Sequence, residues 1–322
     1  MRVVRCILLL YLITGGAQVF SQPANWHPEK TVRIIAPGAG SGTDLTARLL
    51  SKQLAKIWNQ AVIIENKPGA GGAIGINAVI NASPDGYTLL ANSATYVINP
   101  AVYKKLPYDA SKGLVDVALV TSTPYVLVVS AEGPYKSLKD LIVAAKEQRS
   151  DISYGSAGVG SSTHLAAEYF NQAAVIHPLH VPYKSSPEVI QDVIAGRITY
   201  FMAPFDIVIS YIKSRKLIAL GLTSKEKLTG FPDLVTMSEQ GFPNVIMQFW
   251  VGLWMPSATP SEIVRKVNAD VNQALQEPEM KASFEANGVQ VRPMSQPVFK
   301  QFIQDELLKY RQIVAKSSIT GD

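Results

Sequence analysis

The chain has 322 residues, of which 47% are hydrophobic, and it carries a formal net charge of +5. This length exceeds the size at which a single hydrophobic core usually stops growing, so we expect two lobes. The lysines and arginines are scattered and form no basic stripe with interleaved aromatic residues, which argues against nucleic acid as a partner.

The amino terminus has the layout of a secretory signal peptide. Arg2 and Arg5 precede an apolar run at 6–13, and small residues follow it. The run is too short to cross a bilayer, and no later stretch approaches the roughly 20 uninterrupted apolar residues that a helical span needs. We therefore expect residues 1–21 to be a signal peptide and the mature chain to be periplasmic, without insertion into a membrane.

Two details of processing depend on the same segment. Ala17 and Ser21 both offer a small residue to a signal peptidase, so the sequence leaves the cleavage site open. Cys6 is the only cysteine and lies at the start of the apolar run. The mature chain would therefore contain no thiol, which suits an oxidising compartment, and we expect no lipid anchor.

Short β-branched runs alternate with amphipathic segments along the rest of the chain, a pattern typical of an α/β fold. The expected strands lie at 32–36, 61–65, 87–92, 117–121, 125–130 and 152–154, and the expected helices include 44–58 and 165–173. The strand-like segments 120–129 and 249–256 lie between helix-rich blocks and form the expected hinge. The first lobe would then be discontinuous, 26–123 with 249–322, and the second would be 124–248.

Several helix starts carry a capping signal. Thr259 offers a capping hydroxyl, Pro260 suits the first helical position, and Glu262 can reach back to the start. Two further starts and one glycine stop are expected at Ser137 with Asp140, at Ser185 or Ser186 with Pro187, and at Gly196.

Two glycine- and hydroxyl-rich segments each join an expected strand to an expected helix. They are 37–44, with the sequence PGAGSGTD, and 154–164, with the sequence YGSAGVGSSTH. Such a loop can point several backbone N–H groups at an anion, aided by the positive end of the helix dipole. Thr43 stands where a dinucleotide-binding motif needs its third glycine, and the Gly-Lys-Ser/Thr of a phosphate-binding loop is absent. Two such helix starts indicate one anion held from both sides, and the alternative is a pair of purely structural turns.

A serine hydrolase and a metal site are the enzymatic alternatives. Ser161 or Ser162 could act with His164, but the segment lacks the Gly-x-Ser-x-Gly elbow. His164 also lies only two residues after Ser162, whereas the histidine of such hydrolases comes from a distant part of the chain. His177 and His180 have no carboxylate at a spacing that would complete a zinc site. We therefore expect no catalytic residue, no metal and no cofactor. A third glycine cluster at 68–75 favours close strand-to-helix packing over ligand contact.

These segments, in this order, resemble the tripartite tricarboxylate transporter receptors, also called the Bug or TctC family of periplasmic solute-binding proteins. The resemblance covers nearly all of the mature chain, and the run ENKPGAGG followed by PDGYTLL is highly specific. It is also carried by VRIIAPGAGSGTDLTARLL, YGSAGVGSSTHLAAEYF, HVPYKSSPEVIQDVIAGRI and GLWMPSATPSEIVRKVN. The resemblance implies a type II, Venus-flytrap binding-protein fold that closes on a small carboxylate and passes it transiently to membrane transporter subunits. A monomer is expected, and a periplasmic partner of a signalling protein is the alternative role.

In such receptors a carboxylate is held without an arginine clamp, by N–H groups, hydroxyls and waters of the two loops. The resemblance implies the following ligand-binding residues: Gly38, Ala39, Gly40, Ser41, Gly42, Thr43, Asn92, Ser93, Thr95, Ser156, Gly158, Gly160, Ser161, Ser162, Tyr183, Ala203 and Phe205. Asp44 is expected to brace its loop, because an unpaired carboxylate would repel an anionic ligand.

Two departures from the family pattern concern the ligand. The family's first loop commonly has an aromatic residue after the proline, whereas Gly38 follows Pro37 here and the loop looks shorter. Many members carry an aspartate in the strand after the helix stop, and Asp206 falls out of register with that position. Phe201 and Phe205 lie near this position in the sequence, so we expect the ligand to be a dicarboxylate or an aromatic carboxylate and not an amino acid. The alternative is that these aromatic residues belong to the core.

Overall fold

The computed structural model of the protein describes residues 26–69, 72–103, 105–106, 108, 113–147, 152–317 and 319. The expected signal peptide at 1–21, with Cys6, lies outside these residues, as do Ala70 and Gly71 of the third glycine cluster. Strands and helices alternate along the chain, which confirms the α/β prediction. The strands are β1 (Val32–Ala36), β2 (Val62–Asn66), β3 (Thr88–Asn92), β4 (Leu114–Ser130), β5 (Ser153–Ser156), β6 (Leu179–Pro182), β7 (Tyr200–Pro204), β8 (Leu217–Leu222), β9 (Gln248–Pro256) and β10 (Gln290–Val291).

The helices follow the expected starts closely. They are α1 (Gly42–Trp58), α2 (Ala73–Ile80), α3 (Thr95–Val102), α4 (Leu138–Lys146), α5 (Ser162–Ala174), α6 (Ser186–Ile194), α7 (Phe205–Lys213), α8 (Ser261–Gln276), α9 (Pro278–Glu285) and α10 (Gln296–Ala315), with a short 3-10 helix, η2, at Ser238–Gln240. None of the described helices is long and apolar enough to cross a membrane.

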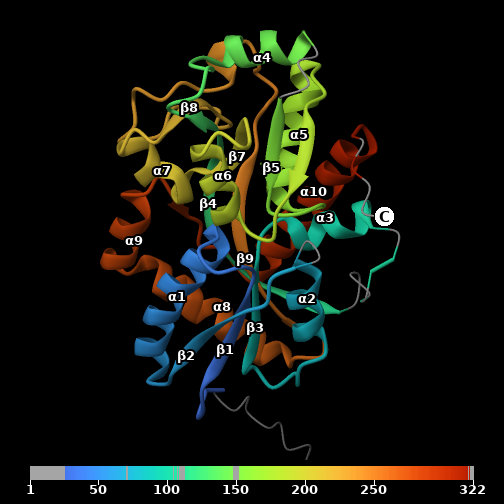
Figure 1. The fold of residues 1–322 in the computed structure, drawn as a ribbon. Coiled ribbons are helices and arrows are strands. Elements are labelled where there is room, and N and C mark those ends of the chain that lie inside the picture. Colours follow the sequence, from blue (N-terminus) through green and yellow to red (C-terminus); the bar gives the residue numbers. More distant parts are fainter. Residues whose placement is uncertain are drawn as a thin grey trace, which may run out of the picture.

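One mixed sheet runs through the molecule in the order β2-β1-β3-β9-β4-β7-β5-β6, and β8 and β10 also pair with β4. Strands β1, β2 and β3 are parallel at one end, and β5, β6 and β7 are parallel at the other. Figure 1 shows β4 and β9 passing between these two ends. Within the described residues, these two strands therefore join the ends of the sheet through its middle.

β4 changes its partners along its length. It pairs with β9 from Leu114 to Pro124, and with β7 and β8 from Tyr125 to Ser130. We expected separate strands at 117–121 and 125–130, whereas the structure has one strand, because Pro124 lies where pairing with β9 ends and no further donor is needed. The change of partner supports the predicted lobe boundary between 123 and 124, which stays a prediction.

Apolar side chains on both faces of the sheet form the core. Leu50 of α1 and Val267 of α8 pack with Ile34 of β1 on one face of the first end. At the other end, Val189 of α6 packs with Phe201 of β7. Each of these side chains is fully buried. The helices thus fix the strand ends at the middle of the molecule, where the glycine-rich loops begin.

Two helix starts and one helix end show how local chemistry sets the element boundaries. The Ser137 hydroxyl accepts a hydrogen bond from the Asp140 N–H at 3.1 Å, which confirms that cap. The Thr259 cap is wrong: α8 begins after Pro260 without a side-chain cap, and the buried Thr259 hydroxyl has no partner among the described residues. Helix α6 ends at Ile194, and Gly196 follows it with a φ of +73°, as expected of a stop.

Candidate functional site

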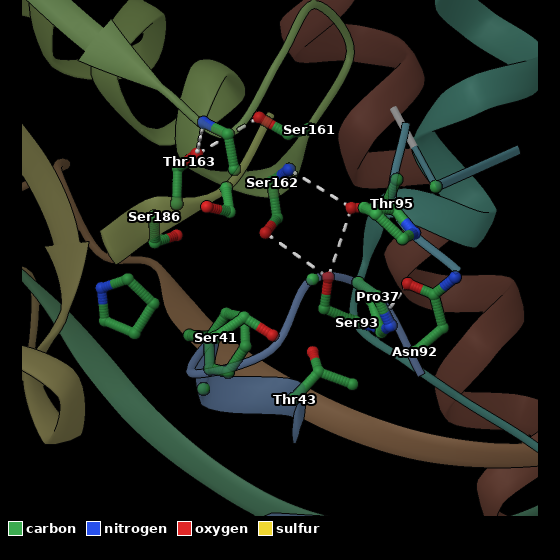
Figure 2. A pocket seen from close by; sticks show the side chains of 18 of the residues that line it. Pro37, Ser41, Thr43, Asn92, Ser93, Thr95, Ser161, Ser162, Thr163 and Ser186 are labelled. Carbon is green, nitrogen blue, oxygen red and sulfur yellow. Dashed lines mark hydrogen bonds between the residues drawn. The ribbon is translucent and has the colours of Figure 1, made fainter. Parts of the chain in front are cut away.

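A cavity of about 60 Å³ lies where the two glycine-rich loops meet. Figure 2 shows Ser41 and Thr43 of the first loop on one side and Ser161, Ser162 and Thr163 of the second loop on the other. The predicted residues that line the cavity are Gly38, Ser41, Gly42, Thr43, Asn92, Ser93, Thr95, Ser161 and Ser162. Hydroxyl groups therefore dominate its polar surface.

The first loop is a tight turn that leads into α1. The Ser41 N–H donates to the Gly38 carbonyl at 3.2 Å, and the Ser41 hydroxyl accepts from the Asp44 N–H at 3.2 Å. Gly40 has a φ of +74°, which favours glycine, and its N–H donates to Asp44 Oδ2 at 2.9 Å. The helix therefore begins at Gly42, with its amino-terminal N–H groups beside the cavity.

Asp44 braces the first loop from behind. Its carboxylate accepts from Arg48 Nε at 2.9 Å and from Asn66 Nδ2 at 2.8 Å, as well as from Gly40. Burial alone would raise the pKa of Asp44, but the hydrogen bonds from Arg48, Asn66 and Gly40 hold it below its ordinary value. The carboxylate is therefore ionised, paired, and directed at its own loop.

The second loop repeats the same local structure. The Ser161 N–H donates to the Gly158 carbonyl at 3.1 Å, and the Ser161 hydroxyl accepts from the His164 N–H at 3.2 Å. Gly160 has a φ of +71°, and its N–H donates to His164 Nδ1 at 3.3 Å. His164 thus occupies the place that Asp44 occupies in the first loop. The two helix starts are matched in geometry and differ in the charge of the bracing side chain.

Hydrogen bonds connect the second loop to the segment that follows β3 (Figure 2). The Ser162 N–H donates to Thr95 Oγ1 at 3.3 Å, and the Ser93 and Ser162 hydroxyls are 3.3 Å apart. The Ser93 hydroxyl also contacts Thr95 Oγ1 at 3.1 Å. Since β3 and α5 belong to different ends of the sheet, these contacts hold the cavity closed on this side.

Gly42 lies in close contact with both ends of the molecule. A Cβ atom there would lie 2.9 Å from the Phe249 ring and 3.3 Å from Asp206 Oδ2. Asp206 Oδ1 is buried and has no hydrogen-bond partner among the described residues. Burial raises the pKa of Asp206 to about 7, although two backbone N–H groups at the start of α7 lower it. This carboxyl lies behind the cavity wall and outside the lining.

Several predicted ligand residues do not reach the cavity. Phe205 is fully buried and packs on Phe231 with ring centroids 5.0 Å apart, so the alternative that it belongs to the core holds. Tyr183 donates to Asp192 at 2.6 Å, and the residues after it, 184–186, line the cavity in its place. The turns behind the lining contain Ala39, Gly40, Gly158 and Gly160. Ser156 forms hydrogen bonds to Gly158 and His180. Ala203 is buried in β7, and its neighbour Pro204 lines the cavity.

Other lining residues were missed. They are Pro37, Pro68, Gly69, Gly72, Ala157, Thr163, Ser186, Pro204 and Phe249, whereas Lys184 and Ser185, which also line the cavity, belong with Tyr183 to the segment that matches the family. Thr163 and the 184–186 segment directly follow the predicted residues Ser162 and Tyr183, so including the immediate sequence neighbours of predicted residues would have found them. Pro68, Gly69 and Gly72 show that the third glycine cluster contributes to the lining, and a Cβ at Gly72 would lie 3.4 Å from the Thr95 side chain. Phe249 gave no local signal, because it reaches the cavity only through the pairing of β9 with β4.

The geometry does not favour a hydrolase. His164 stacks on His180 with ring centroids 3.8 Å apart, and its Nδ1 faces the Gly160 N–H, a donor. Burial and the neighbouring His180 lower the pKa of His164 to about 3, which makes it a poor general base at neutral pH. No group of three histidine, cysteine, aspartate or glutamate residues within the described part of the chain could hold a metal ion.

Comparisons with known proteins match the fold and most of the chain. The family model described as "Tripartite tricarboxylate transporter family receptor" matches residues 46–319. Protein BugT of Bordetella pertussis (strain Tohama I) is 30% identical over 314 residues, covering 97% of this chain and 96% of BugT. MatC from Rhodopseudomonas palustris, solved with bound malate, has a TM-score of 0.85 and 29% identity, covering 89% of this chain and 99% of that one. A second R. palustris protein, solved with adipate, has a TM-score of 0.87 and 25% identity, covering 91% and 99%.

Proposed function

The chain belongs to the tripartite tricarboxylate transporter receptor family, and from this premise we propose that it captures a small dicarboxylate for transporter subunits in the membrane. Proteins of this family are periplasmic solute-binding receptors and not enzymes. The proposed ligand lies in the cavity between the two glycine-rich loops. Its capture accompanies closure of two lobes, 26–123 with 249–322 and 124–248, about the crossing of β4 and β9.

The observation that carries the proposal is the matched pair of helix starts on opposite sides of one cavity. Helix α1 begins at Gly42 and α5 begins at Ser162, and both residues line the cavity. The positive ends of the two helix dipoles favour a negative group between them, while the Ser162 N–H at the start of α5 donates to Thr95 Oγ1. Hydroxyls of Ser41, Thr43 and Ser161 can donate further hydrogen bonds to the same group.

The lining favours a second carboxylate over an amino group. Ala203, in the strand where many family members have an aspartate, is apolar, and Asp206 lies behind the cavity wall. Phe201 and Phe205 are fully buried in the core, so the aromatic surface of the lining comes from Phe249. Lys184 is the cationic side chain in the lining. Malate and adipate, the ligands of the two solved relatives, are both dicarboxylates.

Ligand-dependent thermal stabilisation of the chain without its signal peptide tests the proposal. A ligand at a concentration one hundred times its Kd stabilises the folded state by about 2.7 kcal/mol, which raises Tm measurably. We expect some four- to six-carbon dicarboxylates to raise Tm and amino acids to have no effect. A sugar or a metal ion that raises Tm, with no response to any carboxylate, would contradict the proposal.

Two serine substitutions provide a matched pair for this assay. Ser161→Ala and Ser137→Ala each remove a hydroxyl that accepts the N–H three residues later, at 3.2 and 3.1 Å. Each substitution should lower the free energy of unfolding by about 1 kcal/mol, because a helix cap is lost. Only Ser161 lines the cavity, so only Ser161→Ala should also weaken the response to dicarboxylates. Equal responses in the two variants would place the ligand elsewhere.

A further inference from the structure

A second cavity, of about 300 Å³, lies on the other side of the crossing strands. Gln248 of β9 lines this cavity, whereas its neighbour Phe249 lines the first one. Consecutive residues of a strand point to opposite faces of the sheet. The crossing strands therefore separate the two cavities, and we call the second one the rear cavity.

Four segments that are distant in the sequence form the walls of the rear cavity. They are Pro124 of β4, the 224–229 loop after β8, Gln248, and the 290–292 segment that includes β10. Hydrogen bonds to β4 fix these walls: the Ser122 hydroxyl donates to Gln248 Oε1 at 3.2 Å, and the Thr123 hydroxyl donates to the Gly288 carbonyl at 3.1 Å. The rear cavity is therefore built on the strand that joins both ends of the sheet.

The lining of the rear cavity is polar and positively charged. Three cationic residues, Lys225, Lys227 and Arg292, and one carboxylate residue, Glu226, line it. Lys227 is partly neutralised, because its Nζ lies 3.6 Å from Glu239. Arg292 is oriented by a neutral group, since its Nη2 donates to the Gln290 amide oxygen at 3.2 Å.

One polar group at the rear cavity lacks a partner. Ser224 is only 8% exposed, and its hydroxyl oxygen is buried without a hydrogen-bond partner among the described residues. A buried hydroxyl without a partner is costly, and a bound group that accepts its hydrogen bond would remove that cost. The cationic lining favours an oxyanion, and the Ser224 hydroxyl would need a change of rotamer to reach it.

We propose that the rear cavity binds a small multivalent oxyanion such as inorganic phosphate. Two or three cations around one hollow attract a multivalent anion more strongly than a monovalent one. Lys225 and Arg292 supply the charge-assisted hydrogen bonds, and the 224–229 loop supplies the hydroxyls of Ser224 and Thr229. The anion contacts segments from both predicted lobes.

Equilibrium dialysis with radiolabelled phosphate, at constant ionic strength set with sodium chloride, tests this site. We expect saturable phosphate binding by the wild type, and roughly a tenfold or greater loss of affinity in the double variant K225Q/R292Q. The matched control is K52Q/R265Q, which makes the same change in charge at exposed residues of α1 and α8, outside both cavities. The control should bind phosphate like the wild type.

Three results would overturn the proposal: no saturable binding by the wild type, equal affinity in the two double variants, or loss of phosphate binding in Ser161→Ala alone. The last result would place the phosphate in the first cavity. Circular dichroism of each variant shows that it is folded, and since Lys225 and Arg292 are exposed, we expect no loss of structure. Phosphate binding at the rear cavity does not depend on which ligand the first cavity takes, so the two proposals can fail separately.

Discussion

Replacing the buried carboxyl behind the cavity, Asp206→Asn, should change how the stability of the protein depends on pH. In the folded state burial raises the pKa of Asp206 from its ordinary 3.8 to about 7. Between these two values the folded protein holds a proton that the unfolded chain has released. The stability contributed by this proton is fully present below about pH 4 and is lost as the pH rises through about 7.

The size of the effect follows from the pKa difference. Each unit corresponds to about 1.4 kcal/mol, so a shift from 3.8 to about 7 gives an upper limit of about 4 kcal/mol. The side chain is only partly enclosed as a whole, although Oδ1 is buried, so we expect about 2 to 3 kcal/mol. An asparagine has the shape of the neutral acid and does not titrate. Relative to the wild type, Asp206→Asn should therefore gain this stability between acid and neutral pH.

Urea unfolding of the wild type and of Asp206→Asn at a series of pH values between about 4.5 and 7.5 measures this difference. Asp233→Asn, at an exposed position in the loop after β8, is the matched control and should show no gain. Taking the difference between variant and wild type removes the contributions of all other titrating groups. A difference in unfolding free energy that stays constant across the pH range would refute the assignment of a neutral Asp206 at acid pH.

Three further substitutions have expected outcomes. Burial lowers the pKa of His180 to about 4, so between about pH 4 and 6.5 this residue is protonated in the unfolded chain only, and the wild type loses stability as the pH falls. His180→Phe should remove this loss, which is up to about 3 kcal/mol at pH 4.5. Urea unfolding at pH 4.5 and 7 measures the difference. Gly42→Ala places a Cβ 2.9 Å from the Phe249 ring and should cost about 1 to 3 kcal/mol and weaken dicarboxylate binding; unchanged Tm and affinity would contradict this. The Asp44 carboxylate accepts hydrogen bonds from Gly40, Arg48 and Asn66, and in Asp44→Asn the side-chain NH₂ would face at least one of these donors. The substitution should lower the free energy of unfolding in urea by about 2 to 3 kcal/mol.

Features set by neighbouring residues could be predicted from the sequence. The glycine-rich loops, the Ser137 cap and the brace by Asp44 all depend on residues within a few positions of one another. The spacing of glycine, serine and aspartate specifies the turn, the cap and the start of α1 together. The Thr259 cap failed by a single position, because Pro260 already occupies the start of α8.

Features set by contacts between distant segments could not be predicted in the same way. Phe249 enters the cavity because β9 pairs with β4, and nothing near it in the sequence indicates a ligand. Of the segment 183–185 that matches the family, Lys184 and Ser185 line the cavity and Tyr183 does not, since the direction of the Tyr183 side chain depends on Asp192 in α6. Period-2 alternation indicates which residues share a face, but the register against other strands decides which face meets the cavity.

The difference between the two bracing side chains affects the electrostatics of the cavity. Asp44 and His164 occupy equivalent places and accept the N–H of Gly40 and Gly160. Asp44 is ionised but paired with Arg48, and the pKa of His164, lowered to about 3 by burial and by its stacked neighbour, keeps that ring neutral. Neither brace therefore adds net charge beside the bound group. The field at the cavity then comes from the two helix starts, which are fixed by the fold. For the proposed ligand, this backbone geometry would recognise the first carboxylate, and the other side chains of the lining would select between ligands.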